Sequence, residues 1–227
     1  MKEAKISEIF VSIQGEGLYV GEPQLFIRFY GCNMSCVFCD TRPTTHESFT
    51  KDSLLKKIQK IKEPYNSVSI TGGEPLRQVD FIAEFLPEYK NKYKKEIHLE
   101  TNGTLHRELG IAIDLVDVIA MDFKLPSSTK RASFWMEHEK FLKVARKKKV
   151  FVKAVITSTT TPGDVLRLAE VIARNGKDIP LVLQPATVVG DNEKVSKGTL
   201  ERFKNMALSR LTRVEIVEQT HKLLGVK

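Results

Sequence analysis

The sequence contains no apolar run that approaches the roughly 18 residues needed to cross a membrane as a helix. Its first residues, Met-Lys-Glu-Ala-Lys-Ile, lack the apolar core of a secretory signal peptide. It also contains no internal repeat, no low-complexity segment and no linker rich in proline, glycine or serine. We therefore expect neither a membrane protein, a secreted protein nor a repeat protein, but one domain over residues 1–227 in the cytoplasm.

The sequence contains few cysteines, and they lie close together. The three cysteines lie in the segment Cys32-Asn-Met-Ser-Cys36-Val-Phe-Cys39, with the spacing C-x3-C-x2-C. An odd count without a signal peptide argues against a disulfide framework. Zinc completed by His46 or Asp40 is one alternative, although structural zinc sites usually pair two separated ligand dipeptides. Iron–sulfur clusters usually take four cysteines, so three thiolates on one loop favour a [4Fe–4S] cluster with one iron open to a non-protein ligand. Spacing alone does not decide between the two metals.

Acidic residues are the minority, since 36 Lys and Arg face 28 Asp and Glu and give a formal net charge of +8. Much of the excess lies in two lysine-rich runs, residues 90–95 and 146–149. A basic surface of this kind can bind nucleic acid. Both runs directly precede an apolar, strand-like segment, where cations suit the end of the preceding helix. We interpret them as solvated helix ends and expect no nucleic-acid partner.

Strand-like and helix-like segments alternate along the chain. The patterns predict strands at 6–13, 24–30, 68–71, 96–100, 116–122, 150–156, 180–184 and 213–217, and helices at 53–62, 79–89, 107–115, 133–147, 161–175 and 197–209. This alternation predicts parallel βαβ units. Because a closed eight-fold barrel typically needs about 250 residues, the length favours an α/β fold with a partial, open parallel barrel of about six strands.

Polar residues follow several of these predicted strands. The cysteine loop follows 24–30, Gly72-Gly73-Glu74-Pro75 follows 68–71, and further polar groups follow the next strands at Thr101, Asp122, Lys124 and Gln184. The groups at Thr101, Asp122, Lys124 and Gln184, each taken alone, are more typical of a turn or a cap. Carboxyl ends of parallel strands meet at one edge of the sheet, where such folds hold their ligands. We therefore expect one site there.

The cysteine spacing, with an aromatic residue just before Cys39, resembles the radical S-adenosylmethionine (SAM) superfamily, and Gly72-Gly73-Glu74 resembles its GGE motif. The resemblance implies that SAM chelates the open iron and that an electron from the cluster cleaves it to a 5′-deoxyadenosyl radical. The cluster ligands implied are Cys32, Cys36 and Cys39, with no further catalytic residue. The SAM-binding residues implied are Phe38, Asp40, Gly73, Glu74, Thr101, Asp122, Phe123, Lys124 and Gln184.

Features flanking the cysteines resemble one family within the superfamily. They are residues 13–17 (Ile-Gln-Gly-Glu-Gly), Arg28, the Cys-Asp-Thr ending at Thr41, and residues 219–222 (Gln-Thr-His-Lys). Together they resemble the 7-carboxy-7-deazaguanine synthase family of queuosine-type deazapurine biosynthesis, over nearly the whole chain. The resemblance implies conversion of 6-carboxy-5,6,7,8-tetrahydropterin to 7-carboxy-7-deazaguanine with loss of ammonia, and catalytic use of SAM.

The same resemblance assigns the remaining site residues. A planar guanidinium suits a carboxylate, so Arg28 is expected to hold that of the pterin. A single threonine oxygen can suffice for Mg²⁺, which keeps several waters, and Thr41 is the expected magnesium ligand. The substrate contacts implied are Ile13, Gln14, Gly15, Arg28, Thr71 and His221.

A low-potential electron donor such as flavodoxin or ferredoxin and a second copy of the chain are the expected protein partners. Two other functions stay open on the sequence alone. A glycyl-radical enzyme activase would share the cysteine spacing, although residues 14–17 and Thr41 argue against it. A zinc-binding nucleic-acid module would combine the three cysteines with the positive charge.

Overall fold

The computed structural model describes residues 2–37, 39, 41, 43–187 and 194–219. Nine strands form one sheet in the order β3-β1-β2-β4-β5-β6-β7-β8-β9. Their bounds are β1 (Glu3–Ile13), β2 (Pro23–Phe29), β3 (Glu47–Thr50), β4 (Ser67–Gly72), β5 (Glu96–Thr101), β6 (Val118–Asp122), β7 (Lys149–Ile156), β8 (Leu181–Pro185) and β9 (Val214–Ile216). No helix in these described ranges is long and apolar enough to cross a membrane.

From β2 to β9 each neighbouring pair in the sheet is parallel, while β1 pairs antiparallel with both β2 and β3. The sheet ends at β3 on one side and β9 on the other, so the described strands leave the barrel open. The predicted fold class is therefore confirmed: six parallel strands, β4 to β9, follow the β1–β2 hairpin.

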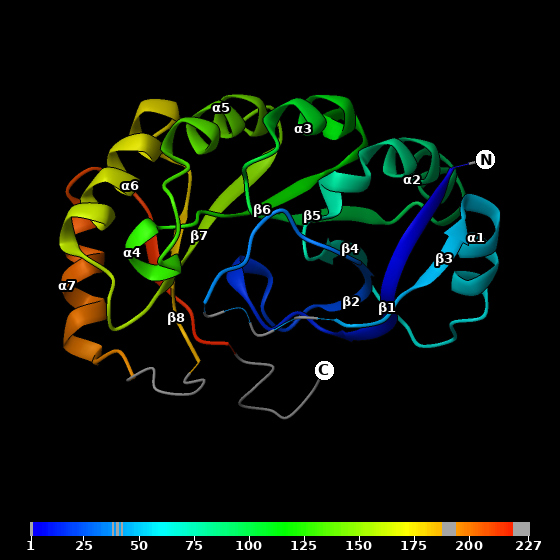
Figure 1. The fold of residues 1–227 in the computed structure, drawn as a ribbon, viewed down its shortest axis with the longest axis horizontal. Coiled ribbons are helices and arrows are strands. Elements are labelled where there is room, and N and C mark those ends of the chain that lie inside the picture. The colour runs from blue at the N-terminus through cyan, green and yellow to red at the C-terminus, as the bar shows by residue number, and fades with distance from the viewer. Residues whose placement is uncertain (1, 38, 40, 42, 188–193, 220–227) are drawn as a thin grey trace.

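Seven helices accompany the sheet in the described part of the chain: α1 (Lys51–Gln59), α2 (Val79–Tyr93), α3 (His106–Ala112), α4 (Pro126–Thr129), α5 (Trp135–Ala145), α6 (Pro162–Asn175) and α7 (Lys197–Leu208). Short 3-10 turns lie at η1 (Gly17–Tyr19), η2 (Pro75–Gln78) and η3 (Ile113–Leu115). Figure 1 shows the longer helices in an arc on the convex side of the curved sheet, with the cysteine loop on the concave side. The helix α4 and the strand β3 were not predicted.

Local chemistry explains where the helices begin. The hydroxyls of Thr50, Thr161 and Ser196 accept the backbone N–H of the third residue of α1, α6 and α7, as N-cap residues do. In α6, Pro162 adds a fixed φ at the first helical position, where no N–H is needed. The apolar faces of the helices pack on the strands, and one large cluster of buried side chains runs from Ala4 to Val214.

A second, smaller cluster of apolar side chains lies on the concave side of the sheet. Val118, Phe151 and Val182 form a second buried cluster, against which Leu18 and Tyr19 of the loop after β1 pack. Gly17 makes this possible, because its φ is +69° and a Cβ there would lie 2.6 Å from the Phe151 ring. The loop after β1 thus folds back onto the concave side of the sheet and covers it near the amino ends of the parallel strands.

Candidate active site

One cavity of about 530 Å³ occupies the concave side between this loop and the carboxyl ends of the strands. The predicted site residues that line it are Ile13, Gln14, Gly15, Arg28, Cys32, Cys36, Cys39, Thr41, Thr71, Gly73, Thr101, Asp122, Lys124 and Gln184. Segments more than 150 residues apart in the sequence therefore meet in one site, as the strand-end argument predicts. Phe38, Asp40 and His221, which were also predicted, lie outside the described residues.

All three cysteines are free thiols on one wall of this cavity. Two arginines from other segments hold their loop: Arg77 donates to the carbonyl of Cys32 at 3.1 Å, and Arg131 to that of Ser35 at 2.8 Å. Burial raises the pKa of the Cys32 and Cys36 thiols. Two carbonyl groups of the loop are thus anchored by arginines from distant segments.

The glycine pair after β4 lets this loop approach the sheet. A Cβ on Gly73 would lie 2.3 Å from the carbonyl oxygen of Gly31 and 2.9 Å from the Cβ of Cys32. A Cβ on Gly72, whose φ is +144°, would lie 2.2 Å from the carbonyl oxygen of Phe29. Neither position has room for a side chain, so both glycines are required by close backbone approach.

Glu74 supports this wall from behind. Its side chain is fully buried, and its carboxylate accepts bonds from the backbone N–H of Leu76 at 3.1 Å and of Asn102 at 2.7 Å and from the Thr101 hydroxyl. Burial raises its pKa to about 7, against the lowering effect of these donors. Glu74 and Phe123, which packs between Trp135 and His138, are the two described site predictions that do not line the cavity.

Alternating charges line another part of the cavity. Lys124 donates to Asp122 at 2.7 Å, and Lys153 is paired with Glu16 and lies 3.7 Å from Asp122. Burial lowers the pKa of both lysines, but the neighbouring carboxylates outweigh it, and each pKa is raised. Both lysines therefore stay cationic in the cavity.

Two buried acceptors on this side have no protein partner among the described residues. They are Oδ1 of Asp122 and Oε1 of Gln184, and both residues line the cavity. A buried acceptor without a donor is costly, so these atoms indicate a ligand that brings its own donors.

A second carboxylate network was missed in the sequence. Glu100 accepts from Gln14 at 2.8 Å, Ser69 at 2.9 Å and Thr71 at 3.1 Å, and thereby joins the loop after β1 to two strands. Lys153 was missed as well. The available signal for Lys153 was its setting among apolar neighbours in a predicted strand, and the signal for Glu100 was its place at the carboxyl end of one.

Arg28 and Thr41 also line the cavity. Arg28 donates through Nε to Glu8 at 2.9 Å, and its guanidinium lies 5.8 Å from the centre of the Phe10 ring. Arg28 is therefore already paired with Glu8 in the structure. Thr41 lines the cavity beside Cys39, whose thiol lies 3.2 Å from the Thr41 carbonyl oxygen.

Comparison with known proteins identifies the family. Residues 26–172 match the model of the radical SAM superfamily. The chain is 35% identical to a 7-carboxy-7-deazaguanine synthase of Geobacter sulfurreducens, with 98% of this chain and 97% of the relative covered. It is 32% identical to a 7-carboxy-7-deazaguanine synthase of Methanothermobacter thermautotrophicus, with 100% and 99% covered.

A solved structure of QueE from Escherichia coli shares the fold, with a TM-score of 0.62, 20% identity, and 96% of this chain and 95% of that chain covered. The superfamily match, with the three cysteines gathered on one cavity wall, selects the iron–sulfur interpretation over zinc. The chain belongs to the radical SAM superfamily and, within it, to the 7-carboxy-7-deazaguanine synthase family.

Proposed function

We propose that this chain converts 6-carboxy-5,6,7,8-tetrahydropterin to 7-carboxy-7-deazaguanine with release of ammonia, as one radical SAM unit over residues 1–227. The observation that carries the proposal is the cavity itself. Its lining brings together the three cysteines, the cation Arg28, the segment Ile13–Gly15, and the strand-end residues Asp122 and Lys124. Full-length similarity to relatives named 7-carboxy-7-deazaguanine synthase supports the same product.

The residues present fit a [4Fe–4S] cluster and SAM. Cys32, Cys36 and Cys39 would supply three thiolates and leave the fourth coordination position for SAM. The partnerless acceptors of Asp122 and Gln184 suit the hydroxyl and amine donors of SAM. When bound, the reduced cluster supplies the electron that cleaves SAM.

The chain's own groups bind and orient in this scheme. Gly73 and Thr101 form the wall on which the methionine part of SAM would rest, with Asp122 and Lys124 beside it. Contacts of Glu74, Phe123, Phe38 and Asp40 with SAM, and of His221 with substrate, stay predictions. On the other side, Gln14 and Thr71 are already oriented by Glu100, so their positions are fixed before a substrate arrives.

A direct assay separates this proposal from the activase alternative. The protein is reconstituted anaerobically with iron and sulfide and incubated with dithionite, SAM and the carboxytetrahydropterin. We expect the product 7-carboxy-7-deazaguanine by mass spectrometry. An activase would leave the pterin unchanged under these conditions.

Replacement of Arg28 tests the carboxylate site. The pair with Glu8 uses Nε of Arg28, which leaves the two Nη atoms to form a fork on a carboxylate. Arg28→Ala should raise KM for the pterin by about ten-fold or more, the effect of a lost charge-assisted bond. Arg28→Lys should also raise it, because the fork is lost although the charge stays.

Glu8→Gln is the matched control for Arg28. It removes the charge of the ion pair and keeps the guanidinium, so a smaller rise in KM is expected. Unchanged KM in Arg28→Ala would remove Arg28 from the substrate site.

Thr41 is proposed to bind a magnesium ion that orients the substrate. Its place on the cavity wall beside Cys39 supports this, and Mg²⁺ needs only one or two protein oxygens. Added Mg²⁺ should stimulate turnover in chelator-treated wild type and Thr41→Ser, and little in Thr41→Val. Equal stimulation in Thr41→Val, or none in wild type, would contradict the role without affecting the cluster.

The partners proposed follow from the chemistry. A low-potential one-electron carrier such as flavodoxin or ferredoxin would reduce the cluster, and the reducing cytoplasm would keep the three thiols available. A homodimer is proposed from the general prevalence of symmetric assemblies.

A further inference from the structure

A closed ring of hydrogen bonds joins the end of β5 to the cysteine loop. Asn102 donates through Nδ2 to Oδ1 of Asn33 at 2.7 Å, and Asn33 donates through Nδ2 to the hydroxyl of Thr104 at 2.9 Å. The Thr104 hydroxyl then donates to Oδ1 of Asn102 at 2.6 Å, which completes the ring. Asn102 and Thr104 are buried, whereas Asn33 is exposed, so the ring closes at the edge of the protein interior.

The ring fixes which way the Asn102 amide points. Its Oδ1 also accepts the backbone N–H of Thr104 at 3.1 Å, so the oxygen must face Thr104 and the amino group must face the loop. Nδ2 has two hydrogens and one strong acceptor in Asn33. It also lies 3.9 Å from Sγ of Cys32, within reach of a weak N–H···S bond.

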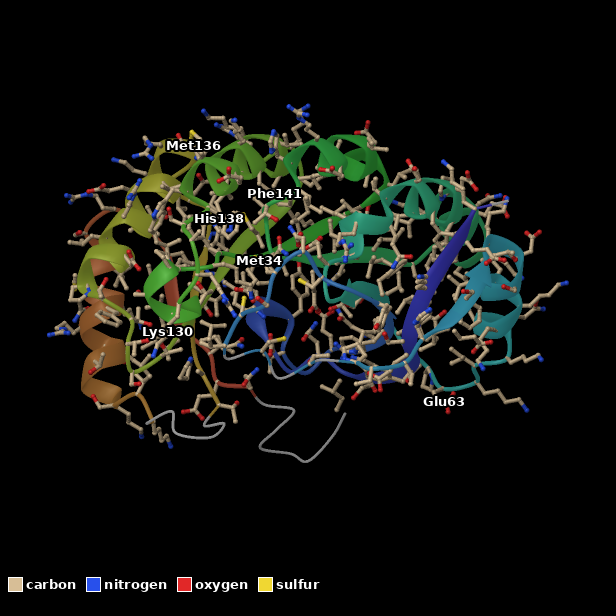
Figure 2. All side chains as sticks on the ribbon, in the orientation of Figure 1. Met34, Glu63, Lys130, Met136, His138 and Phe141 are labelled. Carbon is tan, nitrogen blue, oxygen red and sulfur yellow. The ribbon has the colours of Figure 1, made fainter. Side chains whose placement is uncertain are left out.

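The backbone N–H of Met34 approaches the same sulfur, at 3.4 Å. Two N–H groups, one from the loop and one from the residue after β5, thus converge on Cys32. Figure 2 labels Met34, on the concave side of the sheet, and His138, on α5.

We propose that Asn102 is a positioning residue that raises the reduction potential of the cluster by directing its amide N–H at the Cys32 sulfur. Hydrogen bonds to cluster sulfurs stabilise the more negative, reduced state, and they are one of the means by which proteins set these potentials. The electron enters from a separate donor, dithionite in the test below. The proposal rests on the proposed cluster and is independent of the pterin.

The backbone of Asn102 makes two further hydrogen bonds, which a side-chain replacement leaves in place. Its N–H donates to Oε2 of Glu74 at 2.7 Å, and its carbonyl lies 3.0 Å from Nε2 of His138. Burial lowers the pKa of His138 to about 3, so a neutral ring donates this bond at physiological pH. If a replacement of Asn102 acts through Glu74, the affinity for SAM should change. If it acts through the side-chain amide, the reduction potential of the cluster should change.

The test is a redox titration of the reconstituted enzyme without SAM or pterin, followed by electron paramagnetic resonance of the reduced cluster. Asn102→Ala should lower the midpoint potential, with about five-fold less cluster reduced at a fixed potential, the equilibrium effect of one ordinary hydrogen bond. Asn102→Asp should lower it further, since an acceptor replaces the donor. Thr104→Val should give a smaller shift, because it frees the amide to turn.

Asn175→Ala is the matched control. Asn175 is also buried and bonds a backbone carbonyl, that of Val171, but within α6. We expect the cluster of Asn175→Ala to have the reduction potential of wild type. We expect Asn102→Ala to bind SAM with the dissociation constant of wild type. An unchanged potential in both Asn102→Ala and Thr104→Val, or the same shift in Asn175→Ala, overturns the proposal. Because no pterin is present, failure of the proposed substrate would leave this result intact.

Discussion

Replacement of any one of Cys32, Cys36 and Cys39 by alanine is expected to abolish SAM cleavage. The three thiols on one cavity wall are the full cysteine content of the chain, so no other thiolate can substitute. Because three cysteines would hold three of the four irons of the cluster, loss of one would leave two irons without a protein ligand. Iron and sulfide content and the broad visible absorption of the anaerobic protein measure the loss directly.

A suitable control lies between the ligands. Val37 is 44% exposed and does not line the cavity, so Val37→Ala should keep iron and SAM cleavage near wild type. Full SAM cleavage in one of the three alanine variants would show that this cysteine is not a ligand. Zinc without iron in protein purified under anaerobic conditions would contradict the cluster altogether.

Gly73→Ala should cause the next largest loss, although it replaces no ligand of the cluster. The added methyl group would lie 2.3 Å from the Gly31 carbonyl oxygen, which accepts the backbone N–H of Glu74 at 2.9 Å. Relief of this overlap must move backbone, and the residue that moves with Gly31 is Cys32. We expect a free energy of unfolding lower by about 1–3 kcal/mol, as for other overpacked sites, and a much reduced cluster content.

Gly110→Ala separates this effect from the general effect of a glycine replacement. Gly110 lies in α3 with open space around its Cβ position, and alanine favours a helix interior over glycine by about 1 kcal/mol. The control should therefore be neutral or slightly more stable in urea unfolding, with full cluster content. Wild-type cluster content in Gly73→Ala would mean that the loop does not depend on this close approach.

The order of strands and helices could be predicted from the sequence because each element carries a local pattern. Strands β4 to β9 are short apolar runs bounded by turn residues, and α6 has a threonine cap followed by proline. The strand β3 has four residues and no apolar alternation, and it forms because β1 offers an edge. Pairing of that kind depends on tertiary context and leaves no local signal.

Site residues could be predicted from the sequence where they follow the ends of predicted strands. They could not be predicted where their position depends on tertiary contacts. Asp122 and Gln184 follow from position alone. The placement of the loop after β1 in the barrel depends on a fit between Gly17 and Phe151, residues 134 positions apart. The partners of Glu100 and Lys153, and the pairing of Arg28 with Glu8, arise from that same fold-back or from strand neighbours.

The most direct measurement of the central claim is the amount of 7-carboxy-7-deazaguanine formed per SAM by the reconstituted enzyme. With excess carboxytetrahydropterin, dithionite and Mg²⁺, we predict more than one product molecule per SAM, with SAM recovered at the end and no product from Cys32→Ala. If wild-type enzyme with a full cluster cleaves SAM to 5′-deoxyadenosine and methionine yet forms no deazaguanine, the assignment of this substrate is contradicted.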